Sequence, residues 1–238
     1  MKHFLPAAIL FLAVASLIAQ DDETPADNSD GLPTEYADFL VSHETLSPDG
    51  KMAVIYPKLE VCEDDSDTPA AATRCQNYLV QLQPFQILTK IATDSPHFQS
   101  KSHGGLSIAW AQDQSAVLVT VEGKWGPDDI FLYQLSAGKV IQSTNFLRKV
   151  HDLLAPSFKK SRPSEYNDNF DFIFENDEEQ TPLCQFTDPS HIRVKGYATN
   201  DPKGIADKPW HADIAATWDV TKEKFTSQKI SGTFTGKR

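Results

Sequence analysis

Short apolar runs recur along the chain, and a polar turn precedes each one. The first example is LSPDGKMAVIYP at 46–57, in which Pro48 presets φ for a tight turn and Gly50 permits a positive φ. An Asp-bearing turn again precedes a β-branched run at 109–121 and, more weakly, at 185–194. The pattern predicts strands that are entered through tight turns.

A second apolar element follows each of these runs, at 78–82, 130–141 and 214–225. Within the second of them, SAGK at 136–139 supplies another turn. Such a unit cannot cover its own apolar face, so neighbouring units must stack on it. The sequence therefore predicts a mainly β fold of antiparallel hairpin repeats.

These phrases resemble the blade repeat of β-propellers of the WD40-like and TolB-like (PD40-type) kind. LSPDGKMAVIYP is similar to the blade phrase FSPDG followed by an apolar strand. IFLYQLSAGKVI at 130–141 is similar to the second blade phrase, with Gln134 where that family usually has Asp. The resemblance covers about half of residues 42–232. It implies a propeller-like fold with a binding or scaffolding role.

The spacing of the repeats leaves two architectures open. Asp49, Asp113 and Asp188 lie 64 and 75 residues apart, whereas propeller blades usually repeat every ~40–45 residues. Three units are also fewer than the roughly four to eight blades of a closed ring. An incomplete or irregular propeller and a two-layer β-sandwich both remain possible.

One segment has helical periodicity. Apolar residues follow helical spacing at 146, 147, 150, 153 and 154. Thr144 or Asn145 can cap the first turn, and Pro156 lies beyond the expected end. We expect a single amphipathic helix within 143–156, docked on a sheet. After it come a basic stretch at 158–163 and an alternating aromatic strand at 169–174.

The N-terminal region predicts export. Lys2 and His3 precede a mostly apolar run that ends at Ala19, which is typical of a secretory signal peptide over residues 1–19. Cleavage is expected after Ala19, with Ala15 as the second choice. Residues 20–35 are acidic and contain little to bury, so we expect a disordered leader before one β-rich domain at 36–238. The mature protein is expected to be secreted or periplasmic, without membrane insertion.

The negative net charge of the chain argues against some classes of binding partner. The formal net charge is −11, and removal of Lys2 with the signal peptide would make it −12. Such a surface repels phosphate backbones and anionic lipids, which argues against nucleic acid and membrane as main partners. A protein or another envelope component is the expected partner.

The three cysteines fit an oxidising compartment. Cys62 and Cys75 enclose a polar loop between two predicted strands, and we expect a disulfide between them. Cys184 would then be a leftover thiol or a buried small apolar side chain.

Most familiar catalytic signatures are missing from the sequence. It contains no G-x-S-x-G, no H-E-x-x-H and no C-x-x-C. The acidic stretches at 63–67 and 167–171 lack the Gly-containing spacing of a calcium loop, which favours solvated loops. We expect no metal and no cofactor, and the scattered residues His97, His103, His191 and His211 define no site.

Tryptophans give the candidate binding residues. Trp125 and Trp210, with the neighbouring His211, are expected in loops rich in Gly or Pro, where binding residues tend to lie. Trp110 and Trp218 lie inside apolar strands and are expected in the core.

Three functions fit the sequence. The first is a non-enzymatic, exported binding protein that recognises a macromolecule through loops of a β scaffold. The second is a small periplasmic hydrolase or lyase with a His/carboxylate cleft. The third is a structural envelope component. A pocket that gathers two histidines and a carboxylate would favour the enzyme, and a pocket without them would favour binding.

Overall fold

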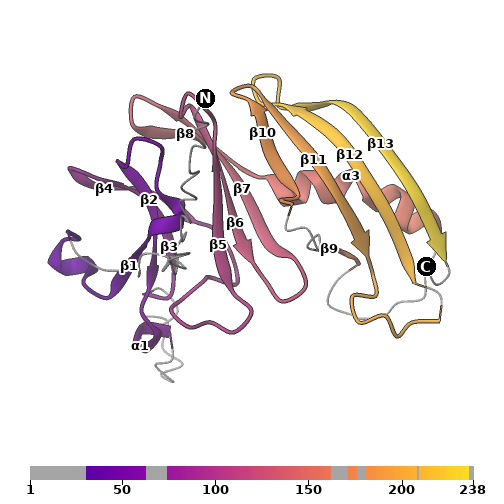
Figure 1. The fold of residues 1–238 in the computed structure, drawn as a ribbon, viewed down its shortest axis with the longest axis horizontal. Coiled ribbons are helices and arrows are strands. Elements are labelled where there is room, and N and C mark those ends of the chain that lie inside the picture. Colours follow the sequence, from indigo (N-terminus) through magenta and orange to yellow (C-terminus); the bar gives the residue numbers. More distant parts are fainter. Residues whose placement is uncertain (1–30, 63–73, 162–170, 176–180, 208, 236–238) are drawn as a thin grey trace, which may run out of the picture.

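The protein is mainly β, with antiparallel sheets and one long helix (Figure 1). The computed structural model describes residues 31–62, 74–161, 171–175, 181–207 and 209–235. The predicted signal peptide, most of the predicted leader and the acidic stretch at 63–67 lie outside the described residues. Within the described ranges, no helix is long and apolar enough to cross a membrane.

Three antiparallel sheets follow one another along the chain and stand side by side in Figure 1. The first contains β1 (Phe39–Ser42), β2 (Met52–Pro57), β3 (Asn77–Leu82) and β4 (Phe85–Ile91). The second contains β5 (Gly105–Trp110), β6 (Ala116–Glu122), β7 (Pro127–Ser136) and β8 (Lys139–Asn145). The third contains β10 (Cys184–Asp188), β11 (His191–Thr199), β12 (Trp210–Asp219) and β13 (Lys224–Thr235).

Within each sheet, every strand pairs with the next strand along the chain. Among the described strands, the short β9 (Ile173–Glu175) alone departs from this order, because it pairs with the far end of β11. Two short 3₁₀ helices, η1 (Thr34–Tyr36) and η2 (His43–Thr45), flank β1. The connectivity confirms the prediction of a mainly β fold made of antiparallel hairpins.

The two central strands of the second sheet, β6 and β7, are buried on both faces. On β6, Val117 and Val119 pack toward the first sheet, whereas Ala116 and Leu118 pack toward the third. All four side chains are almost completely inaccessible to solvent. The continuous apolar run of this strand is therefore explained, since a strand covered on both sides needs no polar alternation.

The helix α3 (Phe146–Ser161) packs in the core between the second and third sheets. Asn145 caps it, because its Oδ1 accepts a hydrogen bond from the Arg148 N–H at 2.9 Å. Phe146, Val150 and Leu154 are fully buried, as the helical spacing predicts.

The predicted end of this helix was wrong, because the helix continues past Pro156 to Ser161. Pro156 removes one backbone donor and crowds the preceding turn, which usually ends a helix. Here Leu154 on one side of the proline and Phe158 on the other both pack into the core. This burial on both sides keeps the chain helical through an exposed proline.

The predicted disulfide between Cys62 and Cys75 is confirmed. It joins the end of α1 (Leu59–Cys62) to the residues just before β3. Cys184 is a free thiol in the core, and burial raises its pKa.

The Asp-bearing turns occupy corresponding places in the three sheets, between the first and second strands. In each turn the aspartate Oδ1 accepts the backbone N–H two residues later, at 2.9–3.1 Å. The acceptors are Asp49, Asp113 and Asp188, and the donors are Lys51, Ser115 and Ser190. The carbonyls of these donor residues in turn accept the N–H of Leu82, Leu135 and Val220, each within one residue of the end of the third strand. One local hydrogen-bond pattern thus joins three strands in every sheet.

These hydrogen bonds to aspartates make the free energy of unfolding depend on pH. The Ser47 hydroxyl and the Lys51 side chain lower the pKa of Asp49 to about 2, and the Ser115 hydroxyl lowers the pKa of Asp113. A carboxylate with a depressed folded-state pKa stabilises the fold above its unfolded pKa of about 3.9 and loses that contribution as pH falls through the folded value. We therefore expect Asp49→Asn to lower the free energy of unfolding at neutral pH and to flatten its decline between about pH 4 and pH 2. Urea unfolding across this range measures both effects.

The matched control is Asp207→Asn, which removes an exposed carboxylate with no hydrogen bond among the described residues. Equal acid dependence in Asp49→Asn and the unsubstituted protein would contradict the role given to this turn.

Candidate functional site

The third sheet has one apolar face and one polar face. On β11, Ile192 and Val194 point into the core, whereas Arg193 and Lys195 are exposed. On β12, Ala216 is buried in the core and Ala215 is exposed on the other side. This period of two is that of a sheet with one covered face. The outer face of the third sheet thus ends the stack of sheets.

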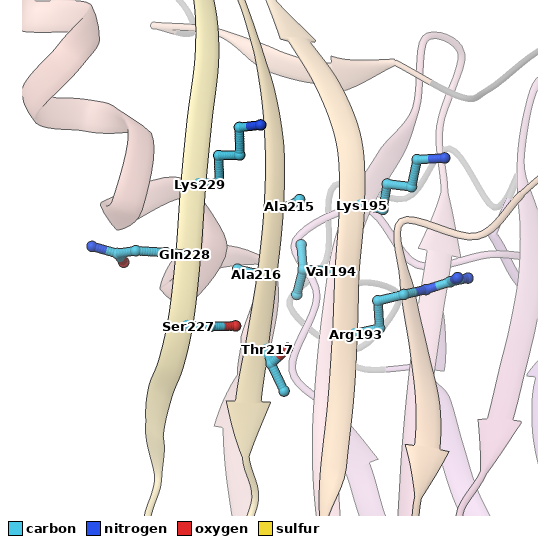
Figure 2. A pocket seen from close by; sticks show the side chains of 9 residues that line it. All are labelled: Arg193, Val194, Lys195, Ala215, Ala216, Thr217, Ser227, Gln228 and Lys229. Carbon is cyan, nitrogen blue, oxygen red and sulfur yellow. The ribbon is translucent and has the colours of Figure 1, made fainter.

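An open trough of about 350 Å³ lies on this sheet (Figure 2). Strand register places Ala215 between Lys195 on β11 and Lys229 on β13, and Thr217 between Arg193 and Ser227. The short side chains on β12 therefore form the floor, and the long cationic side chains form the two rims. The residues that line the trough are Arg193, Val194, Lys195, Ala215, Ala216, Thr217, Ser227, Gln228 and Lys229.

The trough is positively charged although the chain has a formal net charge of −11. Its lining contains three cations and no carboxylate. The Arg193 guanidinium donates to Gln185 Oε1 at 2.8 Å, which anchors it to β10. Within the described ranges, Lys195 and Lys229 form no ion pair. These two ammonium groups are therefore available to an anionic ligand.

Carboxylates mark both ends of the trough along β12. Asp213 and Asp219 lie on the same face as Ala215, toward opposite ends of the strand. Lys222 Nζ lies 2.6 Å from Asp219 Oδ2. The hydrogen bond that the Lys222 ammonium donates lowers the pKa of Asp219. The positive stretch is therefore short, since it extends only along the Ala215 and Thr217 positions.

A histidine and two aspartates meet beside the Asp219 end. His191 Nδ1 lies 2.9 Å from both carboxylate oxygens of Asp188, and His191 Nε2 lies 3.9 Å from Asp219 Oδ2. The backbone N–H of Ser190 and the imidazole of His191 lower the pKa of Asp188. The turn between β10 and β11 explains why Asp188 and His191 lie together, because Asp188 is hydrogen-bonded there to Ser190 N–H and to the His191 ring. In the described part of the chain, no serine or cysteine is hydrogen-bonded to His191 to act as a nucleophile.

The binding residues predicted from the sequence lie in different environments. Trp125 is 37% exposed in the loop between β6 and β7, with Lys124 Nζ 4.9 Å from its ring centroid. Trp210 is fully buried as the first residue of β12, where it packs on Phe158 and Phe172. His211 is also buried, with its ring 5.8 Å from that of Tyr197. The prediction of a loop position was wrong for both Trp210 and His211, because both lie in β12, and Trp210 belongs to the core.

The trough residues were missed because they come from separate strands. The alternation of Arg193 with Ile192 and Val194 is visible in the sequence and places a cation on an outer face. The alignment of Arg193 with Thr217 and Ser227 depends on the register of three strands. A sequence pattern within one strand does not contain that information.

No family model and no curated protein matches this chain in sequence. The functional interpretation therefore rests on the geometry of the trough. Its lining contains no histidine, carboxylate or cysteine. Across the described ranges, no group of three or more His, Cys, Asp or Glu side chains is arranged to hold a metal ion. A small-residue floor between cationic rims is suited to binding an anionic group.

The two tryptophans predict opposite mutational results. Trp210→Ala should lower the free energy of unfolding by about 3–5 kcal/mol, because it removes a fully buried ring and leaves a cavity. Trp125→Ala should lower it by about 1 kcal/mol or less, because that ring is partly solvated. Urea unfolding followed by circular dichroism measures both. Equal losses in the two variants would contradict the assignment of Trp210 to the core.

Proposed function

We propose that this protein is an exported, non-enzymatic binding protein that uses the trough on its third sheet to bind a macromolecular partner. The observation that supports this most directly is the charge of the trough. Three cations surround a floor of small side chains in a chain whose net charge is −11. Surface cations are usually interspersed with acids, so an acid-free group of this kind on a negative protein indicates a ligand of opposite charge.

The scaffold supports a binding role. The three described sheets, of four, four and five strands, resemble propeller blades in the order of their main strands and in the shared turn at each Asp. The described sheets number three, against the roughly four to eight blades of a closed ring, and we propose that they form an incomplete or irregular propeller-like stack. A rigid stack of sheets holds the rims of the trough at fixed separation, which favours recognition without rearrangement.

Export is the second part of the proposal. The predicted signal peptide at 1–19 supports it, and the disulfide between Cys62 and Cys75 fits an oxidising compartment. The partner is then a protein or another component of the envelope or the extracellular medium.

Site-specific crosslinking in the cells that make the protein tests the proposal. A photocrosslinking amino acid in place of Thr217, on the floor of the trough, should give a discrete adduct in the exported fraction. The same group in place of Gln86, an exposed residue of β4, should not. Sequencing of the mature protein should show an N-terminus at Gln20.

Two results would contradict the proposed function. One is an identical set of adducts from positions 217 and 86, which would mean that the trough has no preferred partner. The other is a protein that stays in the cytoplasm with residues 1–19 intact, which would remove the export step.

A further inference from the structure

We infer that the partner presents an extended acidic polypeptide segment, with carboxylates at alternate positions, to the trough. This inference rests on the proposed binding function and names the chemistry of its partner. The observations that support it are the spacing of the cations, the pairing of the floor strand and the carboxylates at the two ends.

The cations have the spacing of an extended chain. Arg193 and Lys195 are two residues apart on β11 and lie on the same face. Alternate residues of an extended strand are about 6.6–6.8 Å apart, so carboxylates at alternate positions of an extended ligand have the same repeat. Lys229 lies two strand spacings, about 9.5 Å, across the sheet from Lys195. A chain lying along β12 would therefore pass between cations on both sides.

The ligand must be recognised through its side chains. β12 pairs with β11 on one side and β13 on the other, so its backbone groups are already hydrogen-bonded. An added strand at a sheet edge, a recurring way to bind an extended peptide, is not possible above this strand. The small side chains of Ala215 and Thr217 instead let a chain approach the face closely. Ion pairs with Arg193, Lys195 and Lys229 then provide the selectivity.

The ends of the trough favour a short acidic segment over a long polyanion. Asp213 bounds the positive stretch along β12 at one end, and at the other end Asp219 is buried and paired with Lys222, so only a few ligand carboxylates meet cations. A nucleic acid or an anionic bilayer would bring further negative charges against Asp213 and against a chain of net charge −11. A peptide can place neutral residues there.

Fluorescence anisotropy with the mature protein tests the inference. The probes are Thr-Glu-Thr-Glu-Thr-Glu, the same composition with its glutamates contiguous, and Thr-Gln-Thr-Gln-Thr-Gln. The alternating acidic peptide should bind most tightly and the neutral peptide should not bind. Affinity should fall several-fold between about 50 mM and about 200 mM NaCl, because exposed ion pairs are screened by salt.

Charge-matched variants separate the trough from the overall charge. R193Q/K195Q/K229Q should weaken binding about ten- to one-hundred-fold, because each exposed ion pair contributes up to a factor of about five. K90Q/K139Q/K149Q changes three exposed lysines elsewhere and shifts the net charge of the mature protein equally, from −12 to −15, and should leave affinity unchanged. Ala215→Glu should abolish binding of the acidic peptide, because the new carboxylate would pair with Lys195 and Lys229. Ala215→Gln, which adds a neutral side chain of similar size, should still bind this peptide. Urea unfolding confirms that all four variants are folded.

Three outcomes would overturn the inference. Equal weakening by the two triple variants would mean that the overall charge governs binding. Tighter binding of an oligonucleotide or of phosphatidylglycerol vesicles than of the acidic peptide would assign the trough to another class of ligand. Failure of every acidic peptide while the position 217 adduct persists would refute the acidic segment and leave the proposed function standing. Peptide binding by the trough without export or a cellular adduct would support the inference and refute the proposed function.

Discussion

Coverage of both faces of the second sheet is the packing constraint on which the fold depends. Alternate residues of β6 belong to two different cores, so this one strand ties the first sheet to the α3 layer and the third sheet. Each fully buried Val or Leu side chain contributes roughly 1.5–3 kcal/mol relative to exposure. Polar substitutions in this strand would therefore damage both interfaces, whereas substitutions on the outer face of the third sheet would damage neither.

The two faces of the third sheet differ in chemistry. The inner face of the third sheet carries Ile192, Val194 and Trp218, which complete the core with α3. Its outer face needs no apolar residues for folding, so Arg193, Lys195 and Lys229 occur there without the desolvation cost of burial. The position of the trough follows from this, because the rigid core fixes the strands while the free face carries the charge.

Local features of this fold were predictable from sequence, and those set by register were not. The strands, the Asn145-capped helix and the Cys62–Cys75 disulfide follow from patterns within short segments. The extension of α3 beyond Pro156 and the burial of Trp210 depend on contacts between Phe158 and the third sheet, which lie far apart in the sequence. The trough was missed for the same reason, since Lys195 and Lys229 meet only through β12.

The helix also explains why the third sheet is a natural end of the stack. β5 contacts β10 directly, whereas α3 contacts β7 on one side and β12 and β13 on the other. The helix therefore fills a wedge that opens between the two sheets from their first strands outward, as its course past the third sheet in Figure 1 indicates. Regular sheet-on-sheet packing keeps faces about 10 Å apart, a separation too small to accommodate an intervening helix of about 10 Å diameter. The helix completes the core on the inner face of the third sheet, and the outer face, on the side away from this core, stays open for a ligand.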